Sequence, residues 1–142
     1  MSGRAVLETD EVTRRRMSRQ RSRNTDPERA LRSRLHRMGL RFRVHRRPVA
    51  GLRREADLVF AGPRVAVFVD GCFWHCCPEH ATSPRANRAW WAAKLAANVE
   101  RDRDTDRRLA EEGWRVVRVW EHEDPARAAA RVAEVVRRRL LA

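Results

Sequence analysis

Three acidic residues stand in parts of the sequence that are expected to lie close to a hydrophobic core. Asp57 lies inside the apolar run of residues 56–60, and Asp70 directly follows the apolar run 65–69. Glu28 belongs to an expected helix ahead of both. A carboxylate in such a place is desolvated at a cost unless a cation or several hydrogen-bond donors meet it. Carboxylates gathered at strand ends can hold Mg²⁺ against a scissile phosphate; for Asp57 the alternatives are a capped turn or a buried ion pair with an arginine.

A second group of candidate ligands occupies residues 71–80, which read GCFWHCCPEH and hold all three cysteines of the chain. Thiolate and imidazole ligands in sets of four suit tetrahedral Zn²⁺, whereas three cysteines in a cytosolic protein do not indicate a disulfide framework. The alternative ligand sets use Cys76 or His75, and reduced buried thiols without a metal are a further alternative. The predicted ligands of a closed structural zinc site are Cys72, Cys77, His80 and His122.

Aromatic residues accompany these candidate groups. Phe73 and Trp74 lie in the same segment, and the pair Trp90-Trp91 opens an expected long helix. On the residues alone, packing in the core is the stronger explanation for these side chains. The tryptophans of a later strand are also assigned to the core: Trp114 and Trp120.

The charge of the chain is strongly positive and unevenly distributed. Of its 32 basic and 19 acidic residues, 17 arginines but only 5 acidic residues fall in residues 1–54, so the net charge of +13 lies almost entirely in that part. A polycationic segment joined to a nearly neutral one indicates a polyanionic partner, and nucleic acid is the usual one. An acidic membrane surface is the alternative, but residues 14–23 lack the bulky apolar face of an interfacial helix.

Hydrophobic spacing and turn residues predict one domain over residues 24–142, preceded by a basic arm over residues 1–23 that orders on DNA. Capping residues and a proline start the first helix at Thr25-Asp26-Pro27, and Gly39 ends it. The expected elements then follow in chain order: strands over 41–45, 56–60 and 65–69, a long charged helix over 87–112, a strand over 114–120, and a last helix opened by Asp124-Pro125.

The order of these elements predicts an α/β sandwich around a mixed sheet. A helix with a glutamate, a strand with an aspartate, a turn and an apolar strand ending in a polar residue are found in that order in the restriction-endonuclease fold. No apolar run approaches the length that crosses a bilayer, and residues 1–23 contain no apolar core of a signal peptide. We therefore expect a soluble, cytoplasmic protein.

Several motifs of the chain resemble the very short patch repair (Vsr) endonucleases. They are VFVDGCFWH at 67–75, NVERD at 98–102, GWRV at 113–116 and VWE at 119–121. The resemblance implies a restriction-endonuclease-like three-layer sandwich with a structural zinc. It also implies an enzyme of the bacterial cytoplasm that nicks DNA 5′ to the T of a T:G mismatch left by deamination of 5-methylcytosine.

The same resemblance implies roles for individual residues. Asp57 matches an aspartate that binds Mg²⁺, together with the main-chain carbonyl of residue 69, which is Val69 here in place of a threonine. His75 matches the histidine that acts on the attacking water, and Glu28 matches a helix glutamate near the waters of the metal. Asp70 stands where the family has a histidine, so it adds negative charge and could serve as a further metal ligand.

The resemblance also bears on the zinc site and on DNA contacts. Cys77 and His122 exchange the ligand types found in the family, which keeps two sulfurs and two nitrogens in the set. An aromatic wedge formed by Phe73, Trp74 and Trp91 would enter the base stack beside the mismatch, where unstacking costs least. The arginines of the arm are expected to contact backbone phosphates without reading sequence: Arg14, Arg15, Arg16, Arg19, Arg21 and Arg23.

The sequence thus predicts an Mg²⁺-dependent mismatch endonuclease whose catalytic residues are Asp57, His75, Glu28 and Asp70. We expect it to act as a monomer on double-stranded DNA, and mismatch-repair proteins are candidate partners. Two alternatives stay open: a related endonuclease acting on another mismatch, a deaminated base or modified DNA, and a non-catalytic zinc-stabilised DNA-binding module. Cleavage of a mismatch panel in the presence of Mg²⁺ distinguishes the three.

Overall fold

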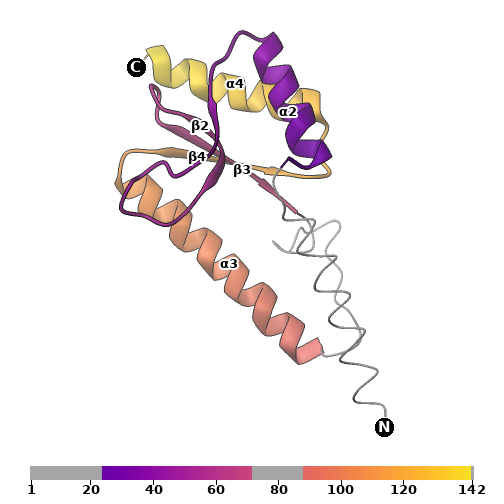
Figure 1. The fold of residues 1–142 in the computed structure, drawn as a ribbon. Coiled ribbons are helices and arrows are strands. Elements are labelled where there is room, and N and C mark those ends of the chain that lie inside the picture. Colours follow the sequence, from indigo (N-terminus) through magenta and orange to yellow (C-terminus); the bar gives the residue numbers. More distant parts are fainter. Residues whose placement is uncertain (1–23, 72–87, 142) are drawn as a thin grey trace.

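The computed structural model describes residues 24–71 and 88–141, and its elements follow the predicted order. A helix is followed by three strands, a long helix, a fourth strand and a last helix (Figure 1). Their bounds are α2 Asp26–Arg37, β1 Arg43–Arg46, β2 Ala56–Phe60, β3 Val65–Asp70, α3 Arg88–Glu111, β4 Arg115–Trp120 and α4 Pro125–Leu141.

Local sequence explains where the two helices on one side of the sheet begin and which face they bury. Helix α2 has a proline in its first turn and acidic residues there, and Leu31 and Leu35, one turn apart, are its buried apolar side chains. It ends before Gly39, whose φ of +80° places it in the left-handed region that favours glycine. Along α4, small and branched residues recur at helical spacing and are buried: Ala128, Ala129, Val132, Ala133 and Val136.

The four strands form one mixed sheet in the order β1-β2-β3-β4. Strands β1, β2 and β3 are successively antiparallel, and β3 pairs with β4 in parallel, with Val67 opposite Val117. A parallel pair needs a crossover, and α3 lies in the connection between β3 and β4. The predicted mixed sheet is confirmed.

Helices cover both faces of the sheet, which gives three layers (Figure 1). Alternate side chains of β3 enter two separate cores: Val65 and Val67 pack with α2 and α4, whereas Ala66 and Phe68 pack with Leu109 of α3. Because of this alternation, the last residue of β3, Asp70, falls in the same row as Ala66 and Phe68. This α/β architecture is compatible with a restriction-endonuclease-like fold.

The largest difference from the predicted elements is at the first strand, which spans Arg43–Arg46 instead of residues 41–45. Its His45 has φ +52°, in the left-handed region, so the strand is not a regular extended segment. Trp114 packs partly buried against the α3-side core, and Trp120 is also partly buried. Both agree with the packing role expected for them.

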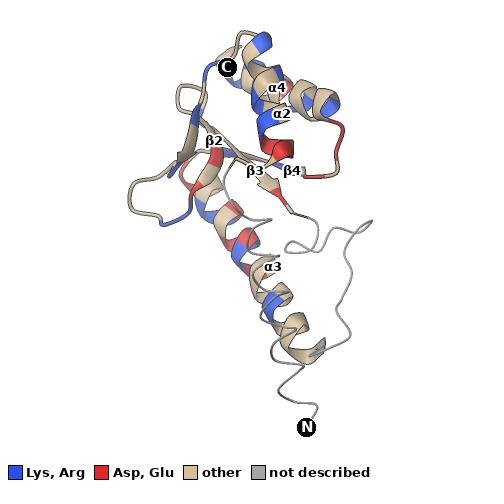
Figure 2. Cartoon of the chain, turned by 45° about the vertical axis from the view of Figure 1, so that its right-hand side comes forward, with Lys and Arg blue, Asp and Glu red and all other residues tan. Residues whose placement is uncertain are grey.

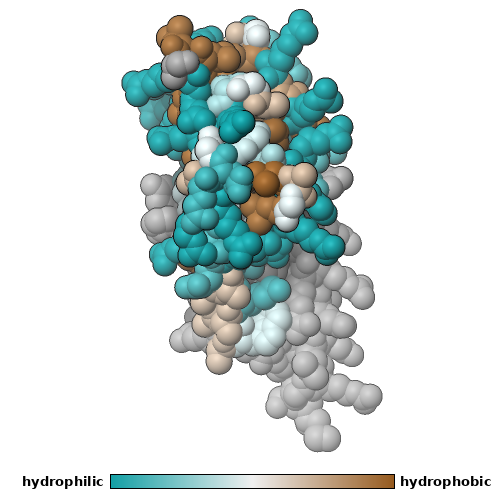
Figure 3. Space-filling model, turned by 90° about the vertical axis from the view of Figure 1, so that its left-hand side faces the viewer, coloured by the Kyte–Doolittle hydropathy of each residue, from teal (hydrophilic) through white to brown (hydrophobic). Residues whose placement is uncertain are grey.

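The colouring of Figure 2 marks basic residues along α2 and α4, and both basic and acidic residues along α3. The face in Figure 3 is mostly hydrophilic, with its larger hydrophobic area toward its upper end. The exposed large apolar residues include Leu140 and Leu141 at the end of α4. Within the described ranges, 24–71 and 88–141, every helix is too short or too polar to cross a membrane.

Candidate active site

A cavity of about 270 Å³ opens between the end of β3, the start of α2 and the side of α3. Its lining is unusually rich in ionisable side chains and includes three of the four residues expected to be catalytic. The carboxylates are Glu28, Glu55, Asp57, Asp70, Asp102 and Glu121. The basic side chains are His45, Arg54, Arg101 and Arg118. The fold therefore brings together acids that lie far apart in the sequence.

Asp57 lies on β2 and is anchored to the neighbouring strand. One oxygen, Oδ2, accepts a hydrogen bond from the Val69 main-chain N–H at 2.7 Å. Burial raises the pKa of Asp57 to about 7; the Val69 N–H opposes this rise, and the nearby Glu28 and Asp70 add to it. Without a cation, this carboxyl group is therefore protonated in about half of the molecules at pH 7.

Glu28 divides its two oxygens between the helix and the cavity. Oε2 accepts hydrogen bonds from the main-chain N–H groups of Asn24 at 2.7 Å and Thr25 at 3.3 Å, just before α2 begins. Oε1 lies 3.3 Å from Nε2 of His45. Glu28 is only 2% exposed, and neither Oε1 nor that nitrogen makes a hydrogen bond in the structure.

Glu28, His45 and Asp57 each offer one ligand atom, and all three atoms lie within 4.8 Å of one another. Two carboxylates and an imidazole are a donor set for a divalent cation, and the buried Glu28 oxygen without a hydrogen-bond donor fits such an ion. The sequence pattern indicates the two acids but not His45. Nothing in its local pattern marked it, because it reads as one residue of a short polar strand.

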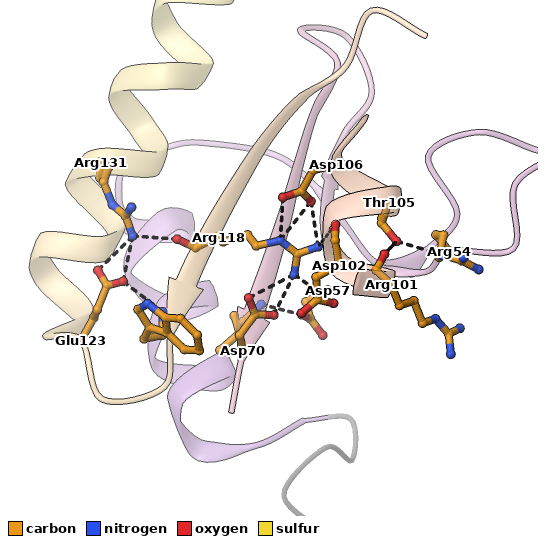
Figure 4. A network of polar contacts seen from close by, with 12 residues as sticks. Arg54, Asp57, Asp70, Arg101, Asp102, Thr105, Asp106, Arg118, Glu123 and Arg131 are labelled. Carbon is orange, nitrogen blue, oxygen red and sulfur yellow. Dashed lines mark hydrogen bonds and ion pairs between the residues drawn. The ribbon is translucent and has the colours of Figure 1, made fainter. Parts of the chain in front are cut away.

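Asp70 is neutralised by an arginine from the neighbouring strand. Both of its oxygens accept from Nη1 of Arg118 at 3.0 Å, and Asp70 is 4% exposed (Figure 4). The same guanidinium bonds through Nε and Nη2 to Asp106 of α3 and stacks over the Phe68 ring at 4.4 Å. Burial alone would lower the pKa of Arg118, but Asp106, Asp70 and Asp102 together raise it. The negative charge expected from Asp70 is thus compensated within the protein.

A second arginine-centred contact fixes the wall of the cavity formed by α3. Thr105 is buried; its hydroxyl accepts from Nε of Arg54 at 2.9 Å and donates to the Arg101 carbonyl at 2.8 Å (Figure 4). Arg54 also lies 3.4 Å from Asp104. These bonds connect the segment between β1 and β2 to the middle of the long helix.

The remaining predicted residues fall into two groups. Phe73, Trp74, His75, Cys72, Cys77, His80 and the six arginines of residues 14–23 lie outside the described residues, so their roles stay predictions. Of the others, His122 lies exposed in the turn after β4. Trp91 is fully buried and meets Trp90 edge to face at 4.7 Å, whereas Trp90 is 40% exposed. In this structure Trp90 presents the accessible ring of the pair. The DNA contact expected of Trp91 stays a prediction.

The fold and the cavity together point to a class of proteins. A mixed sheet between helices, with buried carboxylates at the ends of its strands in a strongly basic chain, is compatible with a metal-dependent nuclease of the restriction-endonuclease type.

Comparison with known proteins identifies the family. The sequence model described as DNA mismatch endonuclease Vsr matches residues 7–80. The chain is 46% identical over 124 residues to the type II nicking enzyme V.NaeI of Lentzea aerocolonigenes, covering 86% of this chain and 75% of that protein. It is 44% identical over 110 residues to the type II nicking enzyme V.XorIIP of Xanthomonas oryzae pv. oryzae, covering 75% and 77%. It is 42% identical over 101 residues to the DNA mismatch endonuclease Vsr of Escherichia coli, covering 70% and 63%.

The chain belongs to the Vsr family of DNA mismatch endonucleases. It is therefore a DNA endonuclease of a mismatch-specific family.

Proposed function

We propose that this endonuclease nicks one DNA strand 5′ to the T of a T:G mismatch and that it uses Mg²⁺ to do so. The observation that carries the proposal is the cavity in which Asp57 and Glu28, on separate elements, lie together with an unbonded buried oxygen. Membership of a family named for DNA mismatch endonucleases supplies the substrate class. A carboxylate pair of this kind suits an ion that is held against a phosphodiester.

In this proposal each residue near the cavity has a distinct task. Asp57 and the main-chain carbonyl of Val69 hold the Mg²⁺, which when bound offsets negative charge on the phosphate and lowers the pKa of a water. His75 takes the proton of the attacking water as general base. Glu28 orients waters at the ion through Oε1, while Asp70 assists in its ion pair with Arg118.

Recognition of the mismatch is proposed to come from aromatic and basic residues. Phe73, Trp74 and Trp91 form the wedge, which enters most easily where a wobble pair already weakens stacking. The arginines of residues 14–23 hold backbone phosphates. Because two of the relatives are named type II nicking enzymes, a target other than T:G is the second candidate for this chain.

A structural zinc ion is also part of the proposal. Cys72, Cys77, His80 and His122 would hold it, and the two sulfurs and two nitrogens suit tetrahedral Zn²⁺. Metal analysis of protein purified without added metal is expected to give about one zinc per chain. A folded protein that contains no zinc would contradict this site.

The decisive experiment incubates the enzyme and Mg²⁺ with duplexes that carry each mismatch in turn. We expect nicking of the T:G duplex, and Asp57→Asn is expected to lower its rate by about a thousandfold or more while mismatched-duplex binding is kept, because the ion's contribution is several kcal/mol. Glu134→Gln, which changes an exposed acid on α4 to its amide, is the matched control and should leave the rate unchanged.

Wild-type rates for Asp57→Asn would contradict the catalytic assignment. Preference for another mismatch would replace the T:G substrate by the second candidate. Tight binding without a nick under any divalent ion would overturn the proposed function.

A further inference from the structure

We propose that His45 is a further protein ligand, beside Asp57, to a divalent cation in this cavity, and that Glu28 binds the same ion directly through Oε1 instead of through a water. The imidazole of His45 makes the site bind Mn²⁺ more tightly than Mg²⁺. The inference rests on the proposed function in placing a metal ion at Asp57. It goes further by adding a ligand from β1 and by naming the class of ion that this ligand favours.

The first observation is the relation between Glu28 and His45. Oε1 of Glu28 and Nε2 of His45 are 3.3 Å apart, yet neither atom is hydrogen-bonded. The Glu28 side chain is 2% exposed and the His45 side chain 10% exposed, so both atoms are cut off from bulk water. Buried polar atoms are normally satisfied, and two unsatisfied ones facing each other point to a shared third atom between them.

The distance between these two atoms suits a metal ion as that third atom. Two ligands bonded to one ion at about 2.1 Å are separated by about 3.0 Å at a right angle and about 3.4 Å at a tetrahedral angle. The observed 3.3 Å lies within this interval. Asp57 offers a third ligand atom within 4.8 Å of both.

The backbone supplies a second, independent observation. The β1–β2 register pairs Val44 with Leu58 and Arg46 with Ala56, which puts His45 across from Asp57. At that position His45 has φ +52°, a conformation that costs a residue with a side chain about 1–2 kcal/mol. Strain of this kind is retained where the surrounding structure holds it and is concentrated at functional sites. The described non-glycine residues with positive φ are Asn24, His45 and Arg64, and of these three His45 is the one that lines the cavity.

The donor set determines which ions are favoured. Mg²⁺ takes oxygen ligands and gives up its waters reluctantly, whereas an imidazole nitrogen is a good ligand for divalent transition-metal ions. With two carboxylates and one imidazole, the cavity is therefore expected to prefer Mn²⁺ to Mg²⁺. Mg²⁺ would still bind through the carboxylates and water.

The test measures metal binding directly. The full-length protein is dialysed into metal-free buffer without a strong chelator and titrated with Mn²⁺, and the electron paramagnetic resonance signal reports free Mn²⁺; Mg²⁺ affinity follows from competition. We expect His45→Gln to weaken Mn²⁺ binding by about tenfold or more and Mg²⁺ binding by less than about threefold. His36→Gln removes an exposed histidine of α2 and is the matched control, with both affinities unchanged.

A second measurement needs no variant. Cadmium is titrated into nitrogen-labelled wild-type protein, and a scalar coupling between the cadmium nucleus and Nε2 of His45 shows a bond between them. Absence of that coupling, or Mn²⁺ affinity in folded His45→Gln equal to that of the wild type, overturns the inference. If His45→Gln loses Mn²⁺ selectivity while no mismatch is nicked, the proposed function fails and the metal ligand stands. If the wild type nicks a mismatch normally and His45→Gln keeps the Mn²⁺ affinity of the wild type, His45 is not a metal ligand and the proposed function stands.

Discussion

At the scale of single residues, Asp57 combines two properties that oppose each other. Its carboxyl group is buried beside two other acids, which favours the protonated form, but its position on β2 is fixed by a hydrogen bond from the Val69 N–H. A carboxyl group held in this position loses its proton less readily than an ordinary aspartate, and a cation that enters the cavity can displace the proton. In the metal-free protein, ionisation of this buried acid therefore lowers the stability of the fold.

This cost predicts a pH dependence of stability. The pKa of Asp57 is about 7 in the folded protein against 3.8 for an ordinary aspartate, so the folded state binds the proton more tightly. Its contribution to stability is fully present below pH 4 and is lost as the pH rises to about 7. In metal-free buffer the melting temperature of Asp57→Asn relative to the wild type should therefore increase between pH 5 and pH 8, by at least about 4 °C.

Differential scanning calorimetry at the two pH values checks this expectation, and addition of Mg²⁺ at pH 8 should narrow the difference. Equal differences at both pH values would show that Asp57 does not titrate between them. The comparison is made between two proteins at each pH, so the titration of groups that do not interact with Asp57 cancels.

The sequence identified Glu28, Asp57 and Asp70 because each is an acid in a capped helix turn, inside an apolar run or directly after one. It could not identify His45, whose role depends on a left-handed backbone angle, nor Arg118, which reads as one polar residue of the alternating strand RVVRVW. Both residues gain their significance from partners on other elements. Such pairings follow from register and crossover, which local spacing does not determine.

At the scale of elements, Arg118 is the point where three parts of the fold are joined. It extends from β4, pairs with Asp70 at the end of β3, and bonds to Asp106 on α3. Its exposed fraction is 22% against 6% for the side chain of Asp70, so the pair is largely shielded from solvent. Removing one partner would leave the other charge buried.

A double-mutant cycle tests this connection. Arg118→Met is expected to lower the free energy of unfolding by about 3 kcal/mol, since Asp70 loses its counter-charge. Asp70→Asn should cost less, because Arg118 keeps Asp106, and the double variant should recover part of the loss, with a coupling of about 1 kcal/mol or more. Urea denaturation gives these values. Arg138→Met, at an exposed pair on α4, should stay within about 0.5 kcal/mol.

Additive effects of Arg118→Met and Asp70→Asn would contradict the coupling.

The elements themselves were well predicted where hydrophobic periodicity was strong, as in β2, β3 and α4. The first strand was displaced by one or two residues, because its alternation is interrupted at His45. That α3 would direct Asp102 and Asp106 at an arginine of β4 could not be predicted from a helix whose charges are mixed along its length.

At the scale of the whole molecule, the dominant property is charge. In the described part of the chain, basic residues recur along α2 and α4 (Figure 2), and residues 1–23 contribute seven more arginines. Inside the cavity, by contrast, carboxylates outnumber basic groups. The positive charge of the basic residues attracts a DNA duplex, whereas the negative charge in the cavity attracts a cation. The two charges therefore act on different ligands.

The expected consequence is a steep salt dependence of duplex binding. If about six phosphates are bound, affinity should fall by about a thousandfold between 50 and 200 mM salt. Replacing the six arginines of residues 14–23 by glutamine should reduce the slope of log affinity against log salt by about 0.9 for each phosphate that is no longer neutralised, without moving the nick. Fluorescence anisotropy over a salt series measures the slope. An unchanged slope would show that these arginines do not bind phosphate.

Glu28 gives the molecule one more property. Because one of its oxygens receives the main-chain amides at the start of α2 and the other faces the cavity, a ligand that pulls on the second oxygen also tightens the first turn of the helix. Amide hydrogen exchange at the beginning of α2 should therefore slow when the cavity fills. A spectroscopic probe attached near that turn would therefore report whether the cavity is occupied, without any substrate and without a measurement of turnover.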